Sequence, residues 1–428
     1  MLLDKTLTYV SLFSGAGVGC YGLLEEGFEC VATNEILEKR LNIQRINRKC
    51  KLDESYISGD IKKPETKEKI LKQIGFYSKK FGNDRVDLVI ATPPCQGMSV
   101  ANHKKKNDEI KRNSLVVESI DLIKQIKPRF FILENVPSFY KTGCIDKNDN
   151  LLEIGSMIEQ NLSGDYMLYD EVINFKNFGA NSSRTRTLVI GVCKEFKDFI
   201  SALEFFPDFK QEKTLKEVIG SLKPLAWGEY DSTDFYHSFR TYPKHMQEWI
   251  KDLKEGQSAF ENVQDAISDL AYLCSNEGAF ESDYLNPIQS SYQALMRKDS
   301  PKLYNHQATN HSQAALEKLK LINKEQGKEC LPKNLHGKQQ FKSTWGRLNW
   351  NKISPTIDTR LDTPSNGTNS HPELHRSITP REAARIQSFS DNYIFYGNKT
   401  SVCKQIGNAV PPLLALALGK AILKNLRK

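Results

Sequence analysis

A cysteine on a rigid turn is the first residue in this chain whose surroundings favour chemistry. Cys95 lies in the stretch 91–99, Ala-Thr-Pro-Pro-Cys-Gln-Gly-Met-Ser, after the apolar run 86–90, which predicts a buried parallel strand. The two prolines fix φ ahead of the thiol, and the carboxyl ends of parallel strands are where α/β sheets bind ligands. Taken alone, the motif is equally compatible with a small buried core cysteine.

Charged residues lie at two other predicted strands. Glu134 follows the apolar run 130–133, where burial favours a protonated carboxyl that can donate to a ring nitrogen while a thiolate attacks the same ring. Arg184 and Arg186 alternate along the segment 183–188, so they share one face of a strand and could hold a carbonyl oxygen and a phosphate. A capping glutamate and an exposed basic strand edge are the alternatives.

A glycine-rich segment and two carboxylates predict a nucleoside pocket. The sequence FSGAGVGCYG begins at Phe13, and its glycines let a ligand approach the backbone at a helix N-terminus. Glu35, after the second predicted strand, could accept both hydroxyls of a ribose, and Asp60, where the next strand should end, could accept from an adenine amino group. Each carboxylate alone is also compatible with a solvated strand end. No GKS/T motif is present to bind ATP phosphates.

These residues lie on the elements of a predicted α/β domain. Apolar runs at 9–13, 29–33, 86–91, 130–133 and 187–192 alternate with helical patterns, which predicts βαβ units and a doubly wound, mostly parallel sheet. From residue 194 the pattern changes. The segment 200–350 is polar, with helical patterns at 245–253 and 312–325, so we expect a second, smaller and less regular domain. An insertion that only braces the first domain is the alternative.

Clear helix signals return near the end of the chain. Thr379 and Pro380 predict an N-cap and first helical residue, with the helix continuing to Phe389. A last helix begins near Pro411, and its apolar run 413–418 is hydrophobic on every side, which predicts burial.

Composition sets the broad class of protein. The 428 residues are 39% hydrophobic and 26% charged, which is typical of a globular chain of two or three domains. The nine cysteines form no CxxC pairs, which argues against a disulfide framework or a metal site and favours a reducing compartment. We find no signal peptide and no apolar run long enough to span a membrane. The net charge of +8 permits a nucleic-acid partner without requiring one.

In order, the motifs are FSGAG, NE, GDI, PPCQGMS, ENV, SRTR, ITPREAARIQSF and QIGNAVPP. These motifs and their order resemble those of the DNA (cytosine-5)-methyltransferases of bacterial restriction–modification systems. The match covers about 1–193 and 353–428, and the gap between is where this family places its target-recognition domain. The resemblance implies the class I S-adenosylmethionine-dependent methyltransferase fold. It also implies a catalytic and cofactor-binding domain at 1–195, a target-recognition domain at 196–395, and a C-terminal segment, 396–428, that returns to the catalytic domain.

The resemblance also implies residue roles. Cys95 corresponds to the nucleophile that adds to cytosine C6, and Glu134 to the residue that protonates or hydrogen-bonds N3 and the exocyclic amine. Arg184 and Arg186 correspond to the pair that holds O2 of the base and the adjacent backbone. The implied S-adenosylmethionine pocket comprises Phe13, Ser14, Gly15, Gly17, Glu35, Ile36, Asp60, Ile61, Pro93, Leu115, Asn408 and Val410. The implied DNA contacts, in a loop that closes on phosphates, are Gln96, Ser99, Lys104, Lys105 and Lys106. For the lysines, a solvated charge run is the alternative.

The implied activity is methyl transfer to C5 of a cytosine flipped out of a specific duplex DNA sequence, through a covalent bond between Cys95 and C6. The implied partners are double-stranded DNA and a cognate restriction endonuclease, and no membrane. We expect a monomer in the bacterial cytoplasm, associated with the nucleoid. Arg240, Arg297, Asn310 and Arg347 are candidates for base contacts.

Three other functions remain open at this point. The first is the tRNA cytosine-5 methyltransferase branch of the same fold, which has a shorter gap before the last motifs. The second is a catalytically inactive DNA-binding relative, against which the intact Cys95, Glu134 and Arg186 argue. The third is a nicotinamide oxidoreductase, which depends on the Gly-x-Gly-x-x-Gly pattern alone and leaves the cysteine and glutamate motifs unexplained.

Overall fold

The computed structural model describes residues 6–94, 113–198, 200, 205–206, 212–222, 304–309, 311–322, 327–335 and 343–426. Its contacts divide the chain into two units: Met1–Glu212 with Ala409–Lys428, and Lys213–Asn408. The divisions lie later in the chain than the expected domain limits at 195 and 395. The reason at the first division is that Ile200 and Phe205 pack into the apolar core of the first unit.

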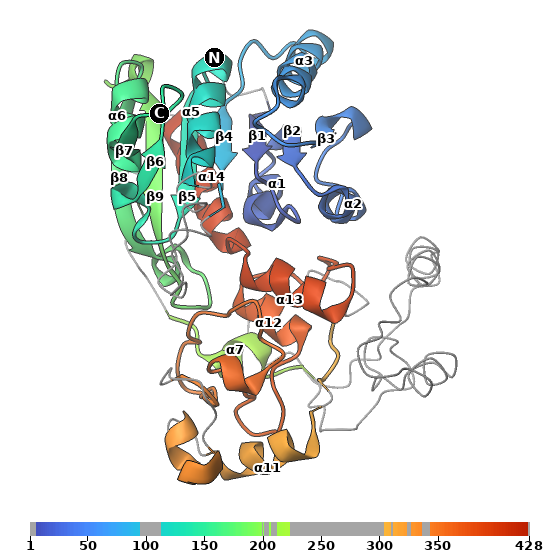
Figure 1. Ribbon diagram of the computed structural model, residues 1–428. Coiled ribbons are helices and arrows are strands. Elements are labelled where there is room, and N and C mark those ends of the chain that lie inside the picture. Colours follow the sequence, from blue (N-terminus) through green and yellow to red (C-terminus); the bar gives the residue numbers. More distant parts are fainter. Residues whose placement is uncertain are drawn as a thin grey trace, which may run out of the picture. The chain divides into compact units, whose positions relative to one another are not determined.

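A seven-stranded sheet forms the centre of the first unit (Figure 1). Its strands are β1 Thr8–Leu12, β2 Glu29–Glu35, β3 Tyr56–Ser58, β4 Leu88–Ala91, β5 Phe130–Asn135, β8 Tyr166–Asn174 and β9 Thr185–Cys193. The spatial order is β3-β2-β1-β4-β5-β9-β8, in which β9 pairs antiparallel with β5 and with β8, and the other pairs are parallel. The predicted α/β fold with a mostly parallel sheet is therefore confirmed.

Helices cover both faces of this sheet. They are α1 Tyr21–Glu25, α2 Glu38–Ile46, α3 Pro64–Phe81, α5 Leu115–Ile126, α6 Ile154–Leu162 and α14 Pro412–Leu426, with short 3-10 turns η1 Val18–Cys20, η2 Asp53–Ser55, η3 Phe139–Lys141, η4 Phe175–Phe178 and η5 Lys194–Phe196. A small hairpin, β6 Gly143–Ile145 and β7 Leu151–Glu153, precedes α6.

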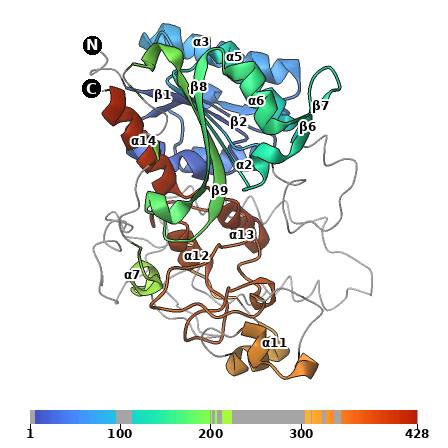
Figure 2. The same cartoon turned by 90° about the vertical axis from the view of Figure 1, so that its left-hand side faces the viewer.

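Alternating side chains on each strand divide the core into two apolar layers. Leu88 and Ile90 pack with α1 and α14 on one face, whereas Val89 and Ala91 pack with α3, α5 and α6 on the other. Figure 2 shows α3 and α5 on the opposite side of the sheet from α14. A strand that is buried on both faces has a continuous apolar sequence. This is why β4 could be predicted from its sequence.

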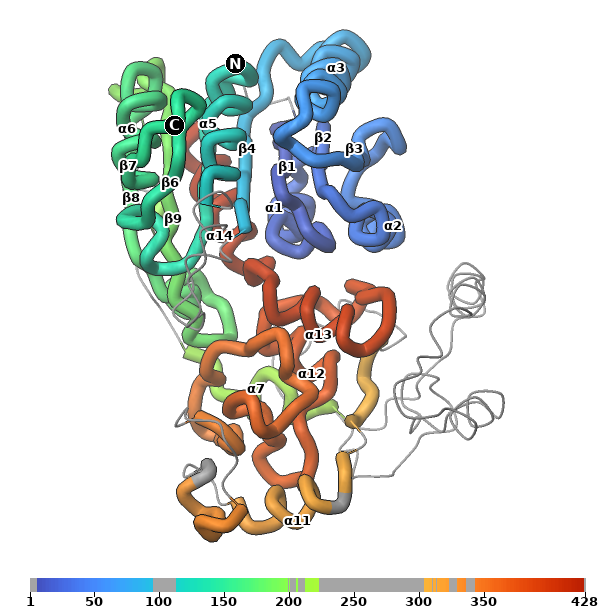
Figure 3. Tube along the Cα trace, viewed as in Figure 1, coloured from blue at the N-terminus to red at the C-terminus, as the bar shows by residue number. Residues whose placement is uncertain are grey.

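Helix α14 returns to the first unit after the second unit has been completed (Figure 3). It crosses α1 in close contact, since a Cβ added to Gly22 would lie 2.0 Å from the carbonyl oxygen of Pro412. By length and composition alone, the stretch Lys399–Leu426 could cross a membrane, but 61% of its most apolar window is buried inside the structure. Leu414, Leu418 and Ile422 belong to the core, so burial against the sheet accounts for the apolar character of α14.

The described part of the second unit consists of short helices and long connections. Its elements are α7 Leu215–Ile219, α11 Gln313–Leu321, α12 Pro380–Ile386 and α13 Lys399–Gly407, with 3-10 turns η9 Gly327–Cys330, η10 Lys333–Leu335 and η11 Pro364–Asn366. The predicted N-cap of α12 is confirmed: Thr379 and Glu382 form a reciprocal capping box, with Pro380 at the first position. Helix α11 begins after Ser312 as predicted, and the helix predicted at 245–253 lies outside the described residues.

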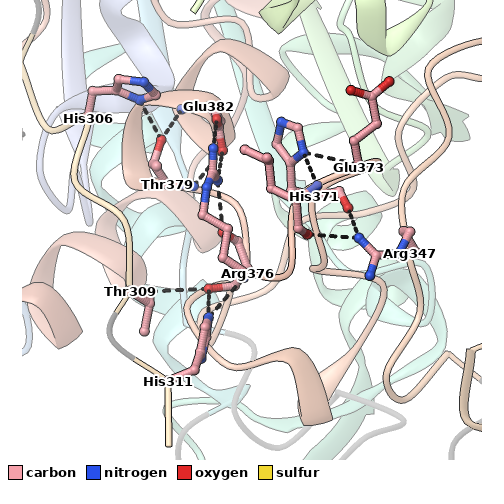
Figure 4. Close-up of polar contacts among 11 residues, drawn as sticks. His306, Thr309, His311, Arg347, His371, Glu373, Arg376, Thr379 and Glu382 are labelled. Atoms are coloured by element: carbon pink, nitrogen blue, oxygen red, sulfur yellow. Dashed lines mark hydrogen bonds and ion pairs between the residues drawn. The ribbon is translucent and has the colours of Figure 1, made fainter. Parts of the chain in front are cut away.

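Buried ionic contacts surround the start of α12 (Figure 4). Arg376 donates to both carboxylate oxygens of Glu382 at 2.8 Å, and Glu382 accepts from the backbone N–H of Thr379 at 2.7 Å. Burial alone raises the pKa of Glu382, but the Arg376 charge outweighs it and holds that pKa well below its ordinary value. The hydroxyl of Thr379 also contacts Nδ1 of His306, at 2.8 Å.

Arg347 is bound to the backbone of the second unit and is only 6% exposed. Its guanidinium donates to four carbonyl oxygens, those of Leu319, Ile322, His371 and Leu374, at 2.5–3.2 Å. The suggestion that Arg347 reads bases is therefore wrong, because its Nε, Nη1 and Nη2 atoms all donate to backbone carbonyls. The other candidates, Arg240, Arg297 and Asn310, lie outside the described residues.

Candidate active site

The polar residues singled out from the sequence meet at one edge of the sheet. Strands β3, β2, β1, β4 and β5 are parallel, so their carboxyl ends share this edge, and antiparallel β9 brings its first residues to the same place. Hydrogen bonds join neighbouring strand ends. Thr92 Oγ1 donates to the carbonyl of Phe13 at 3.2 Å, and Gly59 N donates to the carbonyl of Glu35 at 3.2 Å.

The glycine-rich segment forms a tight turn after β1. Phe13, Gly15 and Gly17 have φ values of 54°, 54° and 85°, in the left-handed region that favours glycine. A Cβ added to Gly15 would meet no atom within 4 Å, so the peptide there faces open space. Ser14 is fixed by two bonds to the carbonyl of Asn34, from its N–H and its hydroxyl, both 3.0 Å. The turn thus leaves room for a ligand to approach the α-carbon of Gly15 closely.

Glu35 is the last residue of β2 and binds the glycine turn. Its Oε2 accepts from Gly15 N at 2.9 Å, and its Oε1 accepts from Leu37 N and from Arg40 Nη1, each at 3.1 Å. The next side chain, Ile36, is 59% exposed. A carboxylate held in place could accept hydrogen bonds from ribose hydroxyls, and an exposed branched apolar side chain beside it could pack against a flat base.

Residues after β3 extend this edge. Asn34 ties β2 to β3, because its Nδ2 donates to the carbonyls of Ile57 at 3.0 Å and Gly59 at 3.2 Å. Asp60 is partly exposed, and its Oδ1 accepts from Lys62 N at 3.0 Å. Ile61, in contrast, is buried in the apolar core. Asp60 can therefore offer an oxygen to a ligand, while the Ile61 side chain packs inward.

The residues that lead to Cys95 are held by the neighbouring strand. Strand β4 pairs with β5, as predicted, and the Nδ2 of Asn135 donates to the carbonyl of Pro93 at 2.9 Å. The other end of that amide is also fixed, since Asn135 Oδ1 accepts from Val136 N at 2.9 Å. Cys95 itself lies outside the described residues, as do Gln96, Ser99, Lys104, Lys105 and Lys106.

Glu134 lies beside Arg186 of β9 and is within the influence of Arg184, the residue before that strand. Its Oε1 is 3.3 Å from Arg186 Nε, and the charges of both Arg186 and Arg184 act on its carboxyl group. Burial raises the pKa of Glu134, and the two arginines oppose the rise without cancelling it. Because β9 runs antiparallel to β5, its first residues lie level with the last residues of β5. This register, more than the sequence spacing, brings the three charged side chains together.

The remaining predicted pocket residues divide between the two units. Leu115 is the first residue of α5 and packs partly buried on the core. Val410 is buried beside the glycine turn, where its Cβ would be 3.2 Å from a Cβ added to Gly19. Asn408 ends α13 in the second unit, and its contact with a cofactor stays a prediction.

Sequence patterns gave no signal for several residues that shape this edge. Arg40, Gln44 and Lys49 look like ordinary polar residues of a surface helix and its end, yet Gln44 and Lys49 are buried. Asn34 and Asn135 each stood in a recognised motif, but only the fold reveals that they join neighbouring strand ends.

Comparison with known proteins agrees with this architecture. The family of C-5 cytosine-specific DNA methylases matches residues 7–424. The type II methyltransferase M.DdeI of Desulfomicrobium norvegicum is 30% identical over 357 residues, covering 79% of this chain and 72% of the relative. M.XorII of Xanthomonas oryzae pv. oryzae is 26% identical over 430 residues, covering 98% and 85%. A crystal structure described as a DNA modification methyltransferase encoded within an E. coli prophage has a TM-score of 0.63 at 23% identity, covering 99% of this chain and 100% of that one.

The chain therefore belongs to the C-5 cytosine-specific DNA methylase family and is a DNA cytosine-5 methyltransferase of the class I methyltransferase fold. The resemblance drawn from the sequence motifs is confirmed by this family match.

Proposed function

We propose that this enzyme methylates C5 of a flipped-out cytosine in a specific duplex sequence, through a transient bond between the Cys95 sulfur and C6. The observation that carries this proposal is the buried Glu134 beside Arg186, on the strand that also holds the backbone of Pro93. Glu134 lies on β5, and Pro93, two residues before Cys95 in the sequence, follows the adjacent strand β4.

The chemistry follows from these side chains. C5 of cytosine is a poor nucleophile, so the Cys95 thiolate first adds to C6 while Glu134, whose pKa is raised by burial, donates to N3. Arg184 and Arg186 hold O2 of the base and the adjacent backbone. The addition leaves C5 as an enamine carbon, which takes the methyl group. Loss of the C5 proton and expulsion of the Cys95 sulfur then restore the aromatic ring.

S-adenosylmethionine would supply the electrophilic methyl group, and the polar edge of the sheet fits it. The open space at Gly15 would allow close approach, Glu35 would accept from the ribose hydroxyls, and Asp60 would accept from the adenine amino group. The exposed Ile36 side chain gives the adenine ring an apolar surface to pack against. Phe13, at the end of β1, completes the set.

The second unit, Lys213–Asn408, is the region that we assign to target recognition. The relatives of the whole chain, M.DdeI and M.XorII, are named type II methyltransferases. These names support a restriction–modification role in which methylation protects DNA from a cognate endonuclease. We further propose a monomer that works on duplex DNA in the bacterial cytoplasm. Flipping one base out of the duplex requires that the rest of the DNA be held, and we assign this role to the second unit.

Covalent trapping tests the proposal. Bisulfite sequencing of a plasmid that carries the gene identifies the methylated base and its context, and a duplex with 5-fluorocytosine at that site is then incubated with enzyme and S-adenosylmethionine. Because fluorine cannot leave as a cation, wild type should form a complex stable to denaturation. The Cys95→Ala variant should form none, whereas Cys330→Ala, which changes a half-buried cysteine in the second unit, should trap normally.

Two outcomes would overturn the proposal. Absence of any covalent complex with the wild-type enzyme would remove the Cys95 mechanism. Methylation of tRNA in place of DNA would leave the cysteine chemistry intact and move the substrate to the alternative branch.

A further inference from the structure

A row of buried polar side chains runs beneath the glycine turn. Lys49 Nζ is 2.9 Å from Thr33 Oγ1, which is 2.8 Å from Gln44 Oε1. The other end of the same amide, Gln44 Nε2, donates to Ser14 Oγ at 2.8 Å and to the carbonyl of Gly15 at 2.7 Å. Gln44 is fully buried and Lys49 is only 3% exposed.

The donors and acceptors of this row can point in one direction only. The ammonium of Lys49 has no lone pair, so Thr33 Oγ1 must accept from it and give its own proton to Gln44 Oε1. That contact fixes which end of the Gln44 amide carries the oxygen. The NH₂ group then has to face Ser14 and Gly15, as observed. The Gly15 carbonyl can only accept and requires the same orientation, so the charge on Lys49 reinforces, through Thr33, an amide that it does not touch.

The same side chains support the turn by direct packing. A Cβ added to Gly17 would lie 2.7 Å from Cγ of Gln44 and 3.3 Å from Cδ of Lys49. The α-carbon of Gly17 therefore rests on the two aliphatic stems. Gln44 therefore binds Ser14 and Gly15 by hydrogen bonds, and the stems of Gln44 and Lys49 pack against Gly17. Together these contacts support the turn from Ser14 to Gly17.

Lys49 does this at a cost to folding. Within the part of the chain that the structure describes, no carboxylate lies in ion-pair distance of its ammonium group. The neighbouring groups on which its charge acts are the thiols of Cys20, Cys30 and Cys50. A buried cation without a carboxylate partner is destabilising relative to an apolar side chain of similar length. Its placement is explained if the charge is needed to order the row.

We propose that Lys49 is a positioning residue for cofactor binding, which acts through Thr33 and Gln44 to hold the Gly15 peptide ready for S-adenosylmethionine. The Gly15 N–H is bonded to Glu35, so the row and the carboxylate grip the two sides of one short segment. Fixing this backbone before binding reduces the ordering that the cofactor would otherwise have to impose. The inference rests on the cofactor pocket proposed above.

Binding of S-adenosylhomocysteine, measured by calorimetry, tests the inference without depending on turnover. Lys49→Met retains the length of the side chain and removes the charge, and should weaken binding roughly tenfold, as expected for one charge-assisted hydrogen bond. Gln44→Leu should weaken it by a similar factor. The double variant should bind no more weakly than the worse single variant, because both changes break the same row.

Two controls separate positioning from general destabilisation. Gln73 is also a buried glutamine of the first unit, with Nε2 donating to Ser55 Oγ at 3.0 Å, so Gln73→Leu should lower the unfolding temperature but keep the affinity. Thr33→Ser keeps the hydroxyl and should keep the affinity, whereas Thr33→Val should lose it. In steady-state assays, Lys49→Met should raise KM for S-adenosylmethionine and leave KM for DNA unchanged.

The outcomes separate a failure of the role proposed for Lys49 from a failure of the proposed cofactor pocket. If wild type binds S-adenosylhomocysteine and folded Lys49→Met binds it equally well, the inference is wrong. If Lys49→Met does not fold, equal affinities for Thr33→Ser and Thr33→Val would reject it instead. If wild type itself does not bind S-adenosylhomocysteine, the proposed cofactor pocket is rejected first.

Discussion

Acid sensitivity of the second unit should depend in part on the buried side chain of His371. His371 is 4% exposed, and its Nδ1 accepts from the backbone N–H groups of Glu373 at 3.2 Å and Leu374 at 3.1 Å. Burial, helped by the charges of Arg376 and Arg347 against those of Glu382 and Glu373, lowers the pKa of His371 to about 4. Protonation of Nδ1 would put a hydrogen where two N–H groups already point.

The size of the effect follows from linkage. Between pH 6.5 and about 4 the unfolded chain binds a proton at His371 and the folded chain does not, so stability falls as the pH falls. A pKa moved from 6.5 to about 4 corresponds to about 3 kcal/mol in full, of which about 2 kcal/mol is lost by pH 5. His371→Asn retains an acceptor oxygen for the two N–H groups and removes the titration. Its unfolding free energy should therefore depend less on pH by these amounts.

Urea unfolding at pH 7.5, 6.5, 5.5 and 5.0 measures this difference. Tryptophan fluorescence is a suitable probe because Trp350 packs edge-on against the His371 ring, with centroids 5.3 Å apart. His311 has a pKa lowered to about 4 as well, so some pH dependence should remain in the variant. His375, at an exposed position, also has a lowered pKa, so His375→Asn should remove some of the pH dependence but less than His371→Asn does. Equal losses in wild type and His371→Asn would refute the reasoning.

Three further results are expected. Glu134→Gln should lower the methylation rate constant by about 10²–10⁴-fold with DNA binding retained, as single-turnover kinetics would measure, because it removes the proton donor; an unchanged rate would exclude that role. Gly22→Ala should lower the unfolding temperature, since its Cβ would lie 2.0 Å from a backbone carbonyl of α14, whereas Gly75→Ala in an open part of α3 should not. Arg376→Met should cost about 3–5 kcal/mol in chemical unfolding because it leaves Glu382 buried without its cation; a loss below 1 kcal/mol would show that the pair is dispensable.

The sequence predicted the elements that are buried on both faces and missed those at the margin. Strands β4 and β5 read as unbroken apolar runs, and each was placed within a residue or two. Strand β8 lies at the sheet edge and carries Asp170, Glu171 and an exposed Val172, so its pattern resembles a loop. Its existence depends on pairing with β9, which no local pattern encodes.

The candidate site divides in the same way. Glu35, Glu134 and Arg186 were identifiable because charged side chains directly follow or interrupt apolar strands. Gln44 and Lys49 were not, because they contact the glycine turn only once α2 has packed beside it. Arg347 was misjudged for the opposite reason: an arginine in a polar segment suggests a nucleic-acid contact, whereas this one donates to two carbonyl groups at the end of α11 and to two in a connection.

The late return of α14 has a consequence during protein synthesis. About 200 residues separate the end of the first stretch of the first unit from Ala409, and at 5–20 residues per second a ribosome needs about 10–40 s to translate them. Throughout that interval the sheet face that receives Leu414 and Leu418 is covered by α1 but lacks α14, so part of its apolar surface is exposed to chaperones and to aggregation. Val410, which is buried beside Gly19, is made only after the second unit has emerged, so the glycine-rich segment gains its last packing partner late in synthesis.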